Sequence, residues 1–209
     1  MLQAIDLECV RGDRCLFRGL GIDLGPGQCL HVAGDNGAGK TSLLRILGGL
    51  LAPTRGMVRW NGQDIAHTRE EYGSELAFVG HANGIKDELT VLENVQFEAA
   101  VRGADAGTDA ALGAVARMGL DDVAEVFVRQ LSQGQKRRVA LARLCGATPA
   151  RIWILDEPFN ALDASAVESL YALIAAQLAA GGIVVLTAHQ KVELPAAAQR
   201  LELAGLASA

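Results

Sequence analysis

Aromatic residues and basic charge are both scarce in this sequence. Phe, Trp and Tyr together make up 4% of the 209 residues, so aliphatic side chains must build the core. Acidic residues outnumber basic ones and leave a net charge of −5. Because binding to a phosphate backbone needs a basic face, this balance gives no indication of a nucleic-acid partner.

Cysteine is rare as well. No two of the four cysteines form a CxxC pair; they are Cys9, Cys15, Cys29 and Cys145. This spacing excludes the common zinc, redox and covalent haem-attachment motifs, and no direct set of haem ligands is evident. We expect reduced, mostly buried thiols in a cytosolic protein. The first residues alternate like a strand and lack the layout of a signal peptide.

One stretch, residues 170–188, holds no charged side chain and is about as long as a membrane span. Gly181 and Gly182 interrupt it. An Ala/Leu segment precedes these glycines, and the β-branched sequence IVVLTA follows them. We therefore predict a buried helix, then a strand buried on both faces, and no membrane span.

The remaining pattern predicts an α/β chain in which strands, loops and helices alternate. Strands are expected at 2–9, 14–24, 28–34, 57–60, 75–79, 151–156 and 200–203, and a helix at 40–50. Residues 84–147 change to a helical pattern. Within them, Thr90 and Glu93 have the spacing of a capping box at a helix start.

The sequence GDNGAGKTS matches the phosphate-binding pattern G-x-x-x-x-G-K-[ST], and it lies between a predicted strand and a predicted helix. Glycines let backbone N–H groups approach phosphate oxygens, and a helix N-terminus adds positive potential. Lys40 is expected at the β- and γ-phosphates and the Thr41 hydroxyl on Mg²⁺. The predicted ATP-binding residues of this glycine-rich loop are Gly34, Asp35, Asn36, Gly37, Ala38, Gly39, Lys40, Thr41 and Ser42.

Two adjacent acids, Asp156 and Glu157, end the hydrophobic run RIWIL. Carboxylates at the end of a buried strand are costly unless they serve a cation or a proton transfer. We assign Asp156 to the Mg²⁺ shell and Glu157 to the polarisation of an attacking water. The alternative is a strand end that reaches solvent, with both acids hydrated.

His189 follows another predicted buried strand, in LTAHQ. A hydrogen-bond donor near the γ-phosphate would stabilise charge during phosphoryl transfer, and we predict this catalytic role for His189. The alternative is a structural histidine.

The segment LSQGQKRRVALARL predicts a second helix N-terminus that attracts an anion. Ser132 and Gln135 have capping-box spacing, Gly134 exposes backbone N–H, and basic residues 136–138 follow. By itself this segment also fits a well-capped basic surface helix.

Taken in order, GDNGAGKTS, LSQGQ, ILDEP, NALD and TAH resemble the motifs of ABC transporter nucleotide-binding domains. The resemblance spans essentially the whole chain. It implies one P-loop NTPase domain over 1–209, with a RecA-like core, an antiparallel β subdomain and an inserted helical subdomain near 84–147. It also implies ATP and Mg²⁺ as cofactors, and a homodimer with ATP sandwiched between two copies.

By the same resemblance, the signature residues act on the ATP of the second copy, and Asp163 lies at the dimer interface. These signature residues are Ser132, Gln133, Gly134 and Gln135. Gln133 replaces a glycine that the family usually has. His81 stands where a glutamine usually couples the nucleotide to the membrane partner, and Arg11 stands where an aromatic residue usually stacks on adenine. Arg11 either stacks on the base or lies in a solvated loop, and the role of His81 stays open.

The short chain and the stretch GHANGIKDELTVLENVQF resemble, within this family, the ATP-binding subunits of cytochrome c maturation. This implies an energy-coupling ATPase bound to an integral membrane permease on the cytoplasmic side of the bacterial inner membrane. The transported species and the transport direction stay open. Alternatives are another compact ABC exporter, a soluble ABC ATPase and a P-loop kinase, although a kinase would not explain LSQGQ or NALD.

Overall fold

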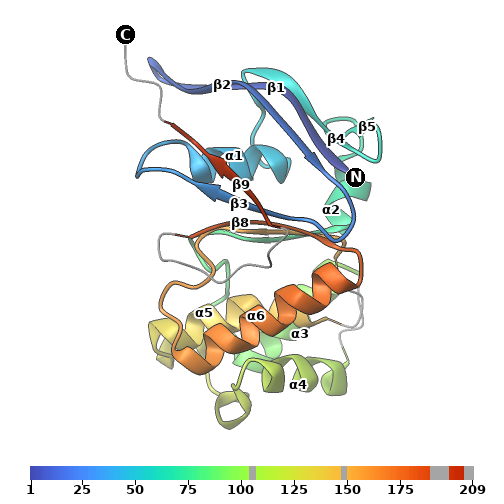
Figure 1. Ribbon diagram of the computed structural model, residues 1–209. Helices are drawn as coiled ribbons and strands as arrows, with labels where there is room; N and C mark the ends of the chain where they lie inside the picture. The colour runs from blue at the N-terminus through green and yellow to red at the C-terminus, as the bar shows by residue number, and fades with distance from the viewer. Residues whose placement is uncertain (104–106, 147–149, 189–197, 205–209) are drawn as a thin grey trace.

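The computed structural model describes residues 1–103, 107–146, 150–188 and 198–204. Figure 1 shows an antiparallel sheet at one side, a parallel sheet across the middle and a group of helices on the other side. Helix α1 (Lys40–Leu47) lies between the two sheets, and α2 (Arg69–Ser74) lies at one end of this layer. The fold is therefore a layered α/β architecture, as predicted.

The antiparallel sheet is formed by the N-terminal hairpin and a second, shorter hairpin. Gly12 has a positive φ of 57° in the first turn, and Asn61 and Gly62 have positive φ values of 49° and 85° in the second. Such backbone angles suit the tight turns of hairpins. In spatial order, its strands are β2 (Arg14–Leu24), β1 (Leu2–Arg11), β4 (Arg55–Trp60) and β5 (Gln63–Asp64).

The central sheet pairs all of its strands in parallel, including strands that lie far apart in the chain. Strands β7 and β8 are buried at every position, which explains their unbroken hydrophobic sequences. In spatial order, its strands are β6 (Leu76–Val79), β7 (Ile152–Leu155), β8 (Ile183–Thr187), β3 (Cys29–Ala33) and β9 (Gln199–Glu202).

Two hydrophobic cores lie on opposite faces of the central sheet. Ile154 packs with Leu43 and Leu44 of α1 in the core beneath the antiparallel sheet. Its neighbours in β7, Trp153 and Leu155, pack in the second core with the helices. Because successive side chains of a strand point to opposite faces, one strand supplies both cores.

The helical layer contains the segment that was predicted to be helical. Thr90 and Ser132 both cap helices, and each forms a complete capping box, as the sequence predicted. The helices are α3 (Val91–Val101), α4 (Thr108–Arg117), α5 (Gln133–Ala142) and α6 (Ala164–Ala179), with 3₁₀ turns at Asp121–Val123, Val128–Gln130 and Arg143–Cys145.

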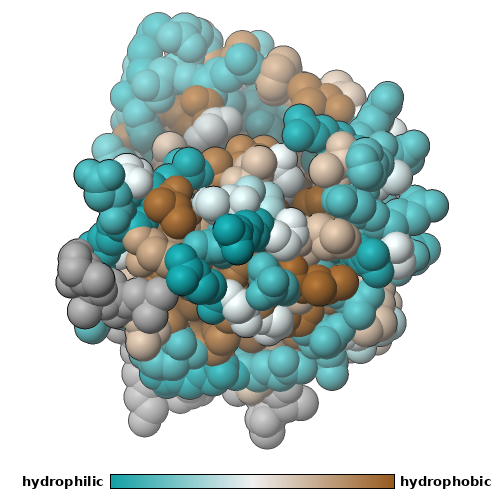
Figure 2. Space-filling view, turned by 90° about the horizontal axis from the view of Figure 1, so that it is seen from above, coloured by the Kyte–Doolittle hydropathy of each residue, from teal (hydrophilic) through white to brown (hydrophobic). Residues whose placement is uncertain are grey.

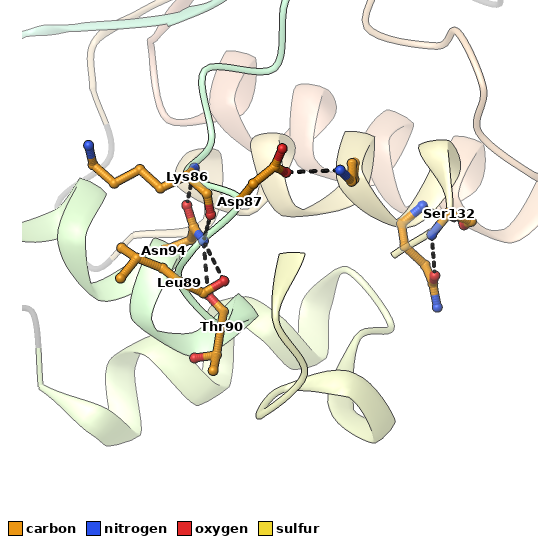
Figure 3. A network of polar contacts seen from close by, with 8 residues as sticks. Lys86, Asp87, Leu89, Thr90, Asn94 and Ser132 are labelled. Carbon is orange, nitrogen blue, oxygen red and sulfur yellow. Dashed lines mark hydrogen bonds and ion pairs between the residues drawn. The ribbon is translucent and has the colours of Figure 1, made fainter. Parts of the chain in front are cut away.

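A buried amide organises the entry to α3. Asn94 accepts a hydrogen bond from Lys86 N at 2.8 Å and donates to Lys86 O and Thr90 O, both at 2.9 Å. Asp87 lies in the same turn, and its carboxylate accepts a hydrogen bond from Lys136 of α5 at 2.9 Å. Figure 3 shows Asn94 pointing into this turn, while Ser132, which caps the start of α5, lies apart from it. The turn before α3 is thus tied to the helix that begins at the signature segment.

The uncharged stretch 170–188 forms the end of α6 and all of β8, as predicted. Among the residues that the structure describes, no helix is both long and apolar enough to cross a bilayer. All four cysteines carry free thiols, and three of them are buried. On the face drawn in Figure 2, hydrophobic residues lie in patches that hydrophilic residues interrupt.

Candidate nucleotide-binding site

The carboxyl ends of four neighbouring parallel strands converge on one region. The glycine-rich loop 34–42 follows β3, the acidic pair Asp156–Glu157 follows β7, and His81 comes shortly after β6. The adjacent strand β8 ends at Thr187. In open parallel sheets, ligands bind outside the carboxyl ends of strands, so this fold brings the predicted residues to the expected place.

The glycine-rich loop wraps around the start of α1. Gly34 has a φ of 135°, and a side chain there would place its Cβ 2.4 Å from the backbone oxygen of Leu203. Lys40 is buried in the first turn of α1, and its Nζ donates to Gly34 O at 2.6 Å and Asp35 O at 3.1 Å. The ammonium group is therefore held inside the curve of the loop, beside the helix N-terminus.

Three strands and α1 meet in one hydrogen-bond network. The Thr41 hydroxyl donates to Asp156 Oδ2 at 2.9 Å, across 115 positions of sequence. The Thr187 hydroxyl donates to Asp156 Oδ1 at 2.8 Å and accepts from Glu157 N at 2.8 Å. Asp156 N donates to Val79 O at 2.7 Å. Both acids are buried, so these contacts set their positions closely.

An open pocket of about 470 Å³ lies over this network. Most of the residues that the sequence predicted for ATP, metal and catalysis meet there, including the exposed Arg11. His81, which stands where the family usually has a coupling glutamine, is also exposed and lines the same pocket. His189 lies outside the described residues. The described residues that line the pocket are Arg11, Leu16, Asn36, Gly37, Gly39, Lys40, Thr41, Ser42, His81, Asp156, Glu157 and Asn160.

The signature segment lies beside this pocket. Within the described part of the chain, residues 131–135 contribute nothing to its lining, and Ser132 and Gln133 are exposed. Gln133 instead lines a smaller neighbouring pocket of about 120 Å³ with His81 and Glu157. At Gly134, an added Cβ would lie 2.7 Å from Ala161 O. The N-terminus of α5 therefore packs closely against the NALD turn.

Three basic residues follow the helix N-terminus that was predicted to attract an anion, and each of them has contacts within the chain. Lys136 pairs with Asp87, and Arg138 pairs with Asp163. Arg137 is buried and donates to backbone carbonyls of the site. All three cations thus have partners within the chain, and the alternative of a basic surface helix is wrong for Arg137.

Sequence reasoning missed three residues that shape the site: Thr187, Arg137 and Asn160. Thr187 had a usable signal, because a hydroxyl at the end of a hydrophobic strand lies beside the neighbouring strand ends of a parallel sheet. Asn160 lines both pockets and belongs to the quoted NALD motif. Arg137 had no local signal, since its burial depends on how α5 packs.

Asp163 has two contacts within its own chain. Its side chain accepts a hydrogen bond from Ala166 N at 3.0 Å, which caps α6, and it also binds Arg138 of α5. The same carboxylate therefore holds two helices together. Its predicted place at a dimer interface stays a prediction, and Asp163 is exposed in the single chain.

Comparisons with known proteins agree with this geometry. A family model described as ABC transporter matches residues 17–160. Two bacterial relatives are both named cytochrome c biogenesis ATP-binding export protein CcmA. The relative from Aromatoleum aromaticum is 49% identical over 208 residues, covering 100% of this chain and 97% of its own length. The relative from Methylococcus capsulatus is 48% identical over 202 residues, covering 97% of each chain.

Solved structures confirm the predicted ABC ATPase fold. An ABC transporter ATP-binding protein from Pyrococcus furiosus superposes with a TM-score of 0.81 at 25% identity, covering 97% of this chain and 96% of that one. A dimeric ATP-binding cassette in a post-hydrolysis state, bound to ADP and Pi, gives a TM-score of 0.77 at 26% identity, with coverages of 91% and 88%. The sequence match, the fold and the converging strand ends lead to the same conclusion: this chain belongs to the ABC transporter family.

Proposed function

We propose that this chain is the ATP-hydrolysing subunit of an ABC export complex that serves cytochrome c biogenesis. The relatives that carry this name match the chain over nearly its full length at 46–49% identity. ATP hydrolysis supplies the energy of export. The observation that carries the proposal is the contact of Thr41 with Asp156, beside Lys40 and Glu157 in one pocket.

In this proposal, the glycine-rich loop binds the nucleotide. Backbone N–H groups of residues 34–39, the N-terminus of α1 and the Lys40 ammonium bind the phosphates. Thr41 and Asp156 present oxygen ligands of the kind that Mg²⁺ prefers, held together by their 2.9 Å hydrogen bond. When bound there, Mg²⁺ neutralises negative charge on the phosphate oxygens. Arg11 contacts the base from the rim of the pocket.

The acidic pair and its neighbours carry out hydrolysis. Glu157 accepts a proton from a water molecule, whose oxygen bonds to the γ-phosphorus as the bond to the β-phosphate oxygen breaks. The products are ADP and inorganic phosphate. His189 donates a hydrogen bond to the γ-phosphate. His81, exposed between the two pockets, senses the γ-phosphate and passes its state to the membrane partner.

Two copies of the chain share each ATP in this proposal. Ser132 and Gln133 are exposed and lie beside their own pocket, which suits contact with nucleotide on a second copy. Dimeric cassettes among the similar structures support such a pairing. Gly134 and Gln135 complete the segment, and Asp163 lies at the interface. An integral membrane permease binds this dimer at the cytoplasmic face of the inner membrane.

Glu157→Gln tests the hydrolytic site. The substitution keeps shape and hydrogen bonding but removes the base, so turnover should fall roughly 10²–10⁴-fold while ATP affinity is retained. Glu125→Gln, at an exposed acid in the helical layer, is the matched control and should hydrolyse ATP at the normal rate. Normal turnover of Glu157→Gln would remove Glu157 from this role.

The export assignment needs a separate experiment. Deleting the gene for this chain from its own bacterium should abolish haem-stained c-type cytochromes, and a plasmid copy should restore them. The Glu157→Gln copy should not restore them, although the protein accumulates. If c-type cytochromes persist in the deletion strain, the link to cytochrome c biogenesis is lost while the ATPase assignment stands.

A further inference from the structure

Arg137 of α5 is a buried cation that contacts the backbone of the acidic pair. Its guanidinium donates to the backbone oxygens of Asp156, Glu157 and Gly80, each at 2.8 Å, and to Asn83 Oδ1 at 3.1 Å. The residue is 4% exposed. Figure 1 shows α5 in the helical layer beneath the parallel sheet. The hydrogen bonds of Arg137 to the backbone just after β6 and β7 therefore join the two layers.

Burying a guanidinium is expensive unless its donors are satisfied. Here burial lowers the pKa of Arg137, while the nearby Asp156 opposes that change. Its Nη2 group donates to the successive carbonyls of Asp156 and Glu157, and its Nη1 group donates to Gly80 O and Asn83 Oδ1. A single ammonium nitrogen cannot reach both sets of acceptors. The cost of burial is thus offset in part by contacts with the backbone of the acidic pair.

That backbone is unusual. Glu157 has a φ of 51°, in the left-handed region that residues with a side chain seldom adopt. Its N–H donates to Thr187 Oγ1 at 2.8 Å, and its carbonyl accepts from Arg137 at 2.8 Å. Surrounding contacts must maintain such a conformation. Arg137 therefore fixes one side of the residue that projects the carboxylate, and Thr187 fixes the other.

We propose that Arg137 is a positioning residue that orients Glu157 for the attack of water. Because Arg137 follows the Ser132 cap by little more than one helical turn, it also links the orientation of Glu157 to the position of the signature helix. Its contacts with Gly80 and Asn83 also connect the loop that carries His81 to the signature helix. The proposal rests on the proposed ATPase function.

Arg143, in the 3₁₀ turn after α5, provides a matched comparison. Its side chain is 12% exposed, and it donates to Phe78 O at 3.3 Å and Asn83 O at 2.9 Å. In the described part of the chain, its hydrogen bonds go to Phe78 of β6 and to Asn83 and Gly84 of the following loop, and not to the acidic pair. Loss of Arg143 therefore loosens the loop and leaves the direct hold on Glu157 in place.

The test compares Arg137→Met and Arg137→Lys with Arg143→Met. In Arg137→Met, kcat should fall roughly 10–100-fold, the scale of a small misplacement of a catalytic group, with ATP Kd unchanged. Arg137→Lys should recover part of the loss, because one ammonium nitrogen can serve only one of the two sets of acceptors. Arg143→Met should lose less than about 3-fold. Equal losses at the two positions, or weaker ATP binding in Arg137→Lys, would overturn the proposal.

A double-mutant cycle supplies the decisive readout. In single-turnover reactions on the Glu157→Gln background, Arg137→Met should change the residual rate by less than about 2-fold, since the group that it orients is gone. Thermal unfolding shows whether each variant is folded and how stable it is. If Arg137→Met lowers the rate by the same factor with and without Glu157→Gln, its role is generally structural, and the proposal for Arg137 alone is overturned. If Glu157→Gln itself turns over normally, the proposed catalytic role fails, and the role of Arg137 fails with it.

Discussion

The hydroxyl of Thr187 lies 2.8 Å from Asp156 Oδ1, deep at the end of β8. The same hydroxyl accepts a hydrogen bond from Glu157 N, also at 2.8 Å. A single oxygen atom thus bridges both members of the acidic pair, and Thr187 is completely buried. The network that includes Thr41 therefore depends on a side chain that has no proposed contact with nucleotide.

Thr187→Val removes this bridge while keeping a similar shape. Asp156 Oδ1 and the backbone N–H of Glu157 then both lose the hydroxyl as a hydrogen-bond partner. This loss should lower the free energy of unfolding by about 1–3 kcal/mol. Turnover should also fall, because both acids lose a fixed position. Urea unfolding and ATPase assays measure the two effects. Thr54→Val is the control, since Thr54 is exposed and its hydroxyl accepts from Val10 N at 2.9 Å. An equal cost there would contradict the prediction.

A mixture of two inactive variants tests whether the pocket is composite. Lys40→Ala removes the phosphate ligand, and Ser132→Ala removes the group proposed to act on the other copy. A mixed dimer holds one pocket with both groups intact, so random pairing should restore about a quarter of the pockets. ATPase assays of the mixture, compared with each variant alone, measure the recovery. A mixture as inactive as its components would argue against shared pockets.

Gly134→Ala tests the close packing of the signature segment. The new Cβ would meet Ala161 O at 2.7 Å, so α5 or the NALD turn must shift. We expect a loss of about 1–3 kcal/mol in stability and weaker ATP-dependent dimerisation by light scattering. Gly113→Ala, on α4 with nothing within 4 Å of its added Cβ, should be neutral or stabilising. Unchanged stability and dimerisation of Gly134→Ala would show that this contact is unimportant.

Thiol reactivity should separate the cysteines. Burial raises the pKa of both Cys29 and Cys145 to about 11. A raised pKa favours the neutral thiol, so at pH 8 only about 10⁻³ of either group is thiolate, and reactivity rises only toward more alkaline pH. Half-buried Cys15 should react first with iodoacetamide in the native protein. Mass spectrometry at pH 8, with and without urea, locates the label; comparable native labelling of Cys145 and Cys15 would contradict the expectation.

Local chemistry made much of this molecule predictable. Thr90 and Ser132 begin helices because each side chain accepts from the backbone three residues later, a contact that depends only on nearby residues. Gly181 and Gly182 separate α6 from β8 for a similarly local reason. The glycine-rich loop was recognisable because its residues, its preceding strand and its following helix are contiguous.

Long-range packing decided how the site residues are arranged and which of them are buried. The sheet order β6-β7-β8-β3-β9 brings Thr41, Asp156 and Thr187 together across more than a hundred residues, and no single stretch of sequence encodes their distances. Arg137 belongs to a basic run that resembles a surface helix, yet it is buried because α5 packs against the ends of β6 and β7. The sequence by itself determined which chemical groups are present and which helix and strand each follows. Only the tertiary structure decided which groups touch, because hydrogen bonds between distant segments form after the sheet and helices have packed.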